Sequence, residues 1–278
     1  MIEKNIFQSW NTRDLPKPVQ DKIDKFKAMN PDYKYHLYLD EEMDKFVNDN
    51  YPGDIADAYN KLNIIVAKVD FWRYLVLYKY GGVYLDIDSN IMKPLNKLIK
   101  DEDEAIITSE AHRHINADTA DTYVCYVQWA LIFKKDHPIL KKTVDLIVDY
   151  IKTNRYPENI HRMTGPTVFT EAVTAIHKEL FNEDPPHWAI NDKPIDKTFS
   201  KDGISYRIFG IMYNGYLDFK DQSHHDILYK NKKHWKDQEK KIPLFKGGKR
   251  GRKTRNRHRK RKRSLASATR RRTSVANL

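Results

Sequence analysis

The stretch that decides the fold is Ala67–Asp88, AKVDFWRYLVLYKYGGVYLDID. Apolar side chains cover most of the circumference of a helix drawn through residues 55–80, which predicts one long buried helix. The pair Gly81–Gly82 ends this helix, because glycine adopts the left-handed backbone that helix C-termini favour. Apolar and polar residues then alternate over 83–88, which predicts a short strand with successive side chains on opposite faces.

The residues before this stretch predict the fold class. Residues 2–10 alternate loosely like a strand, apolar residues at helical spacing then run to Asn30–Pro31, and residues 33–39 (YKYHLYL) suit a second strand. A strand, a helix and a strand in this order are typical of an α/β architecture. Further along, the patterns predict strands at 105–109, 123–133 and 204–212, helices at 137–153 and 167–180, and loops at 112–121 and 182–197.

The positive charge of the chain is confined to one end. The 278 residues include 50 Lys+Arg and 38 Asp+Glu, a formal net charge of +12. Residues 246–278 hold 15 of the basic residues and no acidic one, which leaves 35 basic against 38 acidic residues, or −3, in residues 1–245. We therefore predict a folded domain at 1–245 and a disordered Lys/Arg-rich tail at 246–278.

The tail has three candidate partners: nucleic acid, an importin-type receptor or an anionic membrane. No aromatic residues interleave its basic runs, which disfavours stacking on single-stranded bases. A nucleic-acid- or virion-associated binding protein that acts through the tail is therefore the alternative to any function of the body.

The composition of the chain excludes several classes of protein. Hydrophobic residues make up 40% and aromatic residues 12% of the chain, which is enough for a large core. The single cysteine, Cys125, excludes a disulfide framework and a multi-cysteine zinc site, and its apolar neighbours favour a core position. No apolar run approaches the roughly 18 residues of a membrane span, and residues 1–10 lack the apolar stretch of a signal peptide. We expect a chain with no transmembrane segment, located in the cytoplasm or directed to the nucleus by its tail.

Two carboxylates form the sharpest chemical feature of the sequence. Asp86 and Asp88 lie two residues apart on the predicted strand and therefore share a face, while Ile87 points into the protein. Oxygen ligands placed in this way suit a hard divalent cation, Mn²⁺ or Mg²⁺, that also binds a substrate phosphate. A solvated acidic turn is the alternative. The position at the end of a strand favours the site, because α/β sheets bind ligands at the carboxyl ends of their strands.

A second charged pair precedes these carboxylates on the predicted helix. Asp70 and Arg73 are three residues apart and share a helix face. Arg73 is either a simple intrahelical ion-pair partner or part of a binding site. Charges within an apolar helix are costly without partners, which favours a buried site.

The segment 67–88 closely resembles the DXD core of glycosyltransferase family 32, which includes fungal initiating α-1,6-mannosyltransferases and is related to the glucosylating clostridial toxins. Three shorter stretches support the resemblance: Phe7–Trp10 is similar to an N-terminal HQ-x-W strand of the family, Asn30–Pro31 precedes a Tyr-rich strand, and Thr164–Pro166 reads TGP. The resemblance covers approximately residues 2–180 and is thinner to about 236.

The resemblance implies a GT-A fold, a Rossmann-like mixed sheet flanked by helices, and a hexosyltransferase activity. It also implies a nucleotide-sugar donor (GDP-mannose or a UDP-sugar), a glycan or protein acceptor, a divalent metal, Mn²⁺ or Mg²⁺, and retention of anomeric configuration. No nucleophile or base follows from it. Carried over by position, the implied donor-binding residues are Gln8, Trp10 (stacking on the base), Asp70, Arg73, Tyr84 and Asp86, while Asp88 coordinates the metal with help from Asp86.

The sequence departs from the family pattern at two places. Phe7 stands where the family has a histidine in its N-terminal strand. Near the C-terminus, where the family carries a His before a Ser–Trp pair, this chain has His224–His225 and then Trp235 without that pair. His225 either completes the metal shell or lies in an exposed loop. The pair His112 and His114 fits an exposed loop better than a metal site.

A glycoside hydrolase with paired carboxylates is a third class to consider. Its two carboxyl groups must flank the glycosidic bond from opposite sides. Asp86 and Asp88 project in the same direction from one predicted strand, which disfavours this class.

Overall fold

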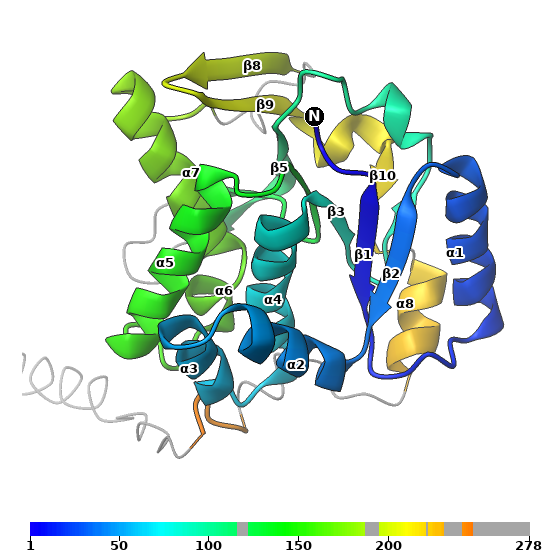
Figure 1. Cartoon of the computed structure of the whole chain (residues 1–278), viewed down its shortest axis with the longest axis horizontal. Helices are drawn as coiled ribbons and strands as arrows, with labels where there is room; N and C mark the ends of the chain where they lie inside the picture. The colour runs from blue at the N-terminus through cyan, green and yellow to red at the C-terminus, as the bar shows by residue number, and fades with distance from the viewer. Residues whose placement is uncertain (116–121, 187–194, 221, 231–240, 247–278) are drawn as a thin grey trace, which may run out of the picture. The chain divides into compact units, whose positions relative to one another are not determined.

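A computed structural model describes residues 1–115, 122–186, 195–220, 222–230 and 241–246 (Figure 1). The strands are β1 (Asn5–Ser9), β2 (Lys34–Tyr38), β3 (Gly82–Leu85), β4 (Asn90–Ile91), β5 (Ala105–Ile115), β6 (Thr122–Tyr126), β7 (Ala130–Phe133), β8 (Asp196–Lys201), β9 (Ile204–Ile211) and β10 (Leu217–Asp218). The helices are α1 (Lys17–Met29), α2 (Asp40–Asn50), α3 (Asp54–Lys61), α4 (Ile65–Tyr80), α5 (Pro138–Lys152), α6 (Ile160–Met163), α7 (Pro166–Phe181) and α8 (Gln222–Tyr229).

One mixed sheet organises the fold. Its strands lie in the order β2-β1-β3-β7-β5-β9-β8, and β6 pairs with β5 beside this path. Strand β1 runs parallel to both β2 and β3, and β5 runs parallel to β9, whereas β7 is antiparallel to β3 and β5. The sheet with its flanking helices confirms the predicted α/β class and the GT-A-type architecture that the resemblance implies (Figure 1).

Two apolar cores cover the two faces of this sheet. Tyr84 of β3 and Leu131 of β7 pack in a core with buried residues of helices α2 to α7. Their neighbours Val83 and Ile132 point the other way, into a core with α1 and with Leu228 of α8. The alternation in the sequence thus divides the strands between two cores, as expected of a sheet that is buried on both faces.

The prediction of one long helix over residues 55–80 is wrong in one respect, because this stretch forms two helices. α3 ends at Lys61 and α4 begins at Ile65. Between them Leu62 adopts an extended backbone (φ −65°, ψ 131°) and forms a β-bridge with Phe245. The break therefore depends on a contact across about 180 residues of sequence, which helical periodicity does not register. α4 itself is buried along most of its length, as predicted.

Residues 241–246, the last described segment, dock on this break. The amide of Asn63 donates to the carbonyl of Leu244 (2.8 Å), and the amide of Lys246 donates to the carbonyl of Lys61 (2.9 Å). The side chain of Leu244 is 3% exposed and packs in the core with α4. This C-terminal segment is therefore part of the folded domain.

Other element predictions are confirmed or corrected. Strand 33–39, strand 204–212 and helices 137–153 and 167–180 agree with β2, β9, α5 and α7. The predicted strand 123–133 is two strands, β6 and β7. The predicted loop 112–121 includes the end of β5, and its residues 116–121 lie outside the described residues. The predicted loop 182–197 includes the first residues of β8. Helices α2 and α8 were not predicted. Cys125 is fully buried, as predicted.

Residues 1–247 form one compact unit. The tail predicted at 246–278 lies outside the described residues, apart from Lys246, so the boundary at 245, the disorder of the tail and its partners remain predictions. Among the helices that the structure describes, none is both long enough and apolar enough to span a membrane.

The turn between α4 and β3 generates a first prediction. Gly82 has φ +116°, and a Cβ there would lie 2.5 Å from the carbonyl oxygen of Asn5 on β1. Gly203 also has a positive φ, +79°, but a Cβ there would meet nothing within 4 Å. We expect Gly203→Ala to lower the free energy of unfolding by about 1–2 kcal/mol from backbone strain alone. Gly82→Ala adds a clash and lowers it by several kcal/mol. Equal losses in chemical denaturation would contradict the role of the close approach.

The docked C-terminal segment generates a second prediction. Replacing a buried leucine by alanine costs about 2–5 kcal/mol, whereas exposed positions change stability by roughly 0.5 kcal/mol or less. Leu244→Ala is therefore expected to destabilise the domain markedly. Ile242→Ala, at a side chain that is 38% exposed, is the matched control and should be near neutral. A neutral Leu244→Ala in denaturant titration would show that the segment is not part of the folded domain.

Candidate active site

The two carboxylates of the DXD sequence lie on a tight turn, not on the strand itself. β3 ends at Leu85, and the amide of Ser89 donates to the carbonyl of Asp86 (2.9 Å) to close the turn. The expectation that Asp86 and Asp88 extend the strand is therefore wrong. Ile87 is 4% exposed and packs in the core with α1, which anchors the turn as predicted. The turn presents both carboxylates at the carboxyl end of β3, where α/β sheets bind ligands.

Neighbouring strands hold the backbone of Asp86. Gln8, on β1, donates from Nε2 to the carbonyl of Asp86 (3.1 Å), and its Oε1 accepts from the hydroxyl of Tyr35 on β2 (2.9 Å). The amide of Asp86 donates to the carbonyl of Trp129 (2.8 Å). Gln8 is fully buried, so the contacts it makes position the turn. Its direct contact with a donor remains a prediction.

Arg73 joins α4 to this turn. Its Nη2 lies 2.9 Å from Oδ1 of Asp70 and 3.4 Å from Oδ1 of Asp86, and its Nη1 donates to the carbonyl of Gln128 (3.0 Å). The guanidinium also lies over the ring of Tyr84, 4.6 Å from its centroid, and the Tyr84 hydroxyl donates to Oδ1 of Asp86 (2.6 Å). Arg73 is thus an intrahelical partner of Asp70 and at the same time the link to Asp86.

Asp70 is a buried carboxylate on α4. The hydroxyl of Thr164 donates to its Oδ2 (3.2 Å), and Gln128 donates to the carbonyl of Thr164 (3.3 Å). Burial raises the pKa of Asp70 to about 6, against the opposing effect of Arg73. Thr164 is the first residue of the TGP stretch, so this motif connects α6 and α7 to the site. No pattern in the sequence singles out Gln128.

α8 brings a histidine to the second carboxylate. Nδ1 of His225 lies 2.8 Å from Oδ2 of Asp88, and the side chains are 20% and 4% exposed. His225 therefore belongs to a helix at the site and not to an exposed loop. Whether it binds metal remains a prediction. The structure gives no side-chain position for His112 and His114, which belong to β5, so their predicted place in a loop is wrong.

An aromatic pair borders the site. Trp10 follows the end of β1, and its ring lies 5.4 Å from that of Tyr229 on α8 at an interplanar angle of 85°. The ring of Tyr229 also lies 4.5 Å from that of His225. Tyr229 is not among the site residues predicted from the sequence. The spacing of four residues between His225 and Tyr229 places both on one helix face and could have indicated it.

Negative charge exceeds positive charge at the site. Asp70 and Asp86 share one guanidinium, that of Arg73, and Asp88 lies two residues beyond Asp86. Lys220 is a further cation whose charge acts on Asp86. Desolvation and the neighbouring Asp88 raise the pKa of Asp86, while Arg73 opposes this shift. A cation that binds here would relieve the repulsion between the two carboxylates.

The carboxylate and imidazole groups at the turn fit a hard divalent cation that also binds the phosphates of a substrate. Asp88 and His225 supply a carboxylate and an imidazole, whereas Oδ1 of Asp86 is already engaged by Tyr84 and Arg73. Within the part of the chain that the structure describes, no group of three or more His, Cys, Asp or Glu side chains is arranged around one point. Cations such as Mg²⁺ commonly take only one or two carboxylates from the protein and complete their shell with phosphate and water.

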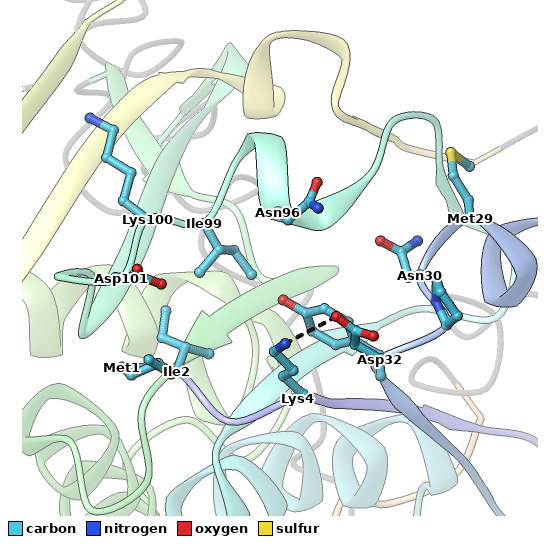
Figure 2. A pocket seen from close by; sticks show the side chains of 12 residues that line it. Met1, Ile2, Lys4, Met29, Asn30, Asp32, Asn96, Ile99, Lys100 and Asp101 are labelled. Atoms are coloured by element: carbon cyan, nitrogen blue, oxygen red, sulfur yellow. Dashed lines mark hydrogen bonds and ion pairs between the residues drawn. The ribbon is translucent and has the colours of Figure 1, made fainter.

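Figure 2 shows a pocket at the other end of the sheet. It is lined by residues at the start of β1, by the connection from α1 to β2 and by residues 96–101. Because β1 and β2 are parallel, these residues lie at the amino ends of the strands, opposite the DXD turn. Lys4 and Asp32 form an ion pair across this pocket (3.1 Å). It is separate from the carboxylate site.

Comparison with known proteins agrees with this geometry. Residues 16–105, which include α4, β3 and the DXD turn, match the model of a family described as "Glycosyltransferase sugar-binding region containing DXD motif". The DXD segment of this chain is therefore similar to that of known glycosyltransferases. This confirms the resemblance to glycosyltransferase family 32 found in the sequence.

Two of the relatives that the chain resembles are fungal proteins. The chain is 29% identical over 200 residues to "Initiation-specific alpha-1,6-mannosyltransferase" of Candida albicans, a match that covers 61% of this chain and 52% of the relative. It is 37% identical over 101 residues to "Inositol phosphoceramide mannosyltransferase 2" of Schizosaccharomyces pombe, covering 36% and 28% of the two chains. The chain thus spans about half of the length of the first relative and less than a third of the length of the second. Among solved structures, "PaToxG Glycosyltransferase" aligns with a TM-score of 0.47 and 22% identity over 65% of this chain and 72% of that one.

The buried carboxylate of Asp70 generates a pH prediction. Its pKa of about 6 lies above the ordinary value of 3.8, so the folded state binds the proton more tightly than the unfolded state. Its ionisation therefore costs stability as the pH rises from about 4 to about 6, by up to roughly 3 kcal/mol. The difference in free energy of unfolding between the wild type and Asp70→Asn should fall with pH over this range and level off above it. A difference that stays constant from pH 4 to 7 would contradict the buried, raised-pKa carboxylate.

Proposed function

We propose that this chain is a metal-dependent hexosyltransferase that moves a hexose from a nucleotide-sugar donor to a glycan or protein acceptor. The observation that carries the proposal is the convergence of Asp70, Arg73, Asp86 and Asp88 at the carboxyl end of β3, in a segment that matches the DXD family model. α8 completes the site by placing His225 on Asp88.

The chemistry of glycosyl transfer accounts for these residue types. Breaking the bond between sugar and phosphate expels a nucleoside diphosphate, whose developing negative charge needs preorganised positive charge. Asp88 and His225 would hold Mn²⁺ or Mg²⁺, which supplies that charge when bound. Arg73, 6% exposed, holds Asp86 in place, while the Asp86 side chain is 27% exposed and open to donor hydroxyls. Direct contacts of Asp70, Arg73 and Tyr84 with the donor belong to the same proposal.

The names of the relatives bear on the donor sugar. Both fungal relatives are named mannosyltransferases, which favours mannose as the hexose. The nucleotide is that of GDP-mannose or of a UDP-sugar, and a panel of both distinguishes them. Retention of anomeric configuration, which the family resemblance implies, is part of the proposal and is read from the anomeric configuration of the first product.

The role of Asp88 can be tested with a near-isosteric variant. Asp88→Asn keeps the volume of the side chain but removes the charge that would bind the cation. We expect it to lower Mn²⁺-dependent release of nucleoside diphosphate about 100-fold or more, the scale seen when a transition-state charge loses its partner. The thermal unfolding of the variant should remain close to that of the wild type.

A matched control is available on the surface. Asp202 is exposed in the turn between β8 and β9 with φ +52°, a conformation that asparagine tolerates. Asp202→Asn should leave both turnover and stability unchanged. Chelation of divalent metal should abolish the activity of the wild type, and added Mn²⁺ or Mg²⁺ should restore it. Retained activity in Asp88→Asn would overturn the proposed function.

A further inference from the structure

Tyr229 of α8 lies between the two parts of the proposed donor site. On one side its ring lies edge-to-face with Trp10, at 5.4 Å, and on the other it lies 4.5 Å from the ring of His225, which contacts Asp88. Aromatic rings therefore run from the predicted base-stacking residue to the predicted metal ligand. Both Trp10 and Tyr229 are partly exposed, so their rings border solvent as well as the core.

The angle between the two rings limits what they can bind. At 85° and 5.4 Å the rings touch, so a flat heterocycle does not fit between them. Two perpendicular rings instead form a corner, in which a flat ring stacks on one face and meets the other ring at its edge. A nucleobase has this flat shape and a polar edge, and any base can stack on an aromatic side chain.

We propose that the ring of Tyr229 forms a second wall beside Trp10 in the nucleoside subsite and contacts the base of the donor. This inference rests on the proposed function, because it assumes that the diphosphate lies at Asp86 and Asp88. It adds a residue from α8, outside residues 16–105 that match the family model.

The hydroxyl of Tyr229 contributes less than its ring to this subsite. Burial and the charges of Asp88 and Asp86 raise the pKa of Tyr229 well above its ordinary value of 10, so the phenol stays protonated and neutral. Tyr229→Phe separates this hydroxyl from the ring.

The Figure 2 pocket does not compete with this corner as a nucleotide site. Its two lysines are both ion-paired, Lys4 with Asp32 (3.1 Å) and Lys100 with Asp196 (3.2 Å). It therefore offers no unpaired lysine to a diphosphate.

Calorimetric titration with three probes tests the inference on the full chain. The probes are GDP, UDP and inorganic pyrophosphate, each with excess Mn²⁺; pyrophosphate carries the metal-binding phosphates but no base. The variants are Tyr229→Phe, Tyr229→Leu and Tyr229→Ala, with Tyr80→Ala as control. Tyr80 is 40% exposed at the far end of α4, beyond the residues that form the site.

We expect Tyr229→Ala and Tyr229→Leu to weaken the nucleoside diphosphate that the wild type prefers about 10-fold or more. Pyrophosphate binding should change less than about twofold, and Tyr229→Phe should bind the nucleotide within about threefold of the wild type. Tyr80→Ala should match the wild type throughout. The leucine variant retains apolar volume, so it serves if the alanine variant unfolds.

Three outcomes would overturn the inference. Unchanged nucleotide affinity in both truncated variants would show that the base does not contact Tyr229. Tighter nucleotide binding would show that the ring blocks Trp10 instead of lining the subsite. Equal weakening of nucleotide and pyrophosphate would show that Tyr229 only supports α8. Failure of the wild type to bind any of the three probes would instead contradict the proposed function, and the inference with it.

Discussion

The site depends on the ion pairs of one guanidinium, that of Arg73. It contacts Asp70 on its own helix, α4, and Asp86 on the turn that follows β3. The Arg73 side chain is 6% exposed, and its guanidinium lies over the ring of Tyr84. A buried charge of this kind is costly unless carboxylates and other acceptors pair with it. This requirement explains why α4, the turn after β3 and the segment between β6 and β7 meet at one place, since each supplies one of these partners.

The same ion pair leaves negative charge uncompensated at the DXD turn. Asp70 and Asp86 both contact one guanidinium, whereas Asp88 contacts the ring of His225. Such a surplus raises the affinity of the turn for a divalent cation and for whatever anion that cation carries. α8 closes over the turn from the other core, so the two cores of the domain each contribute one side of the site.

Much of this arrangement could be predicted from the sequence. The glycine pair, the alternation after it and the spacing of Asp70 and Arg73 are local signals, and they gave the order of α4 and β3 and the association of three of the charged residues. The gap at Leu62 and the placement of Gln128 could not be predicted, because each depends on a partner far away in sequence, Phe245 and Arg73 respectively. The turn at Asp86 was mistaken for strand, because alternation continues across it while the backbone bond from Ser89 to Asp86 does not appear in the pattern.

The central claim is that this site transfers a hexose from a nucleotide sugar. The most direct test is to incubate the protein with a panel of GDP- and UDP-sugars and to measure the release of nucleoside diphosphate with and without Mn²⁺. The account predicts release from at least one member of the panel and loss of that release when the metal is chelated. Release that is unaffected by chelation would contradict the metal-dependent site. No release from any donor, in the presence of metal and acceptor glycans, would contradict the transferase itself.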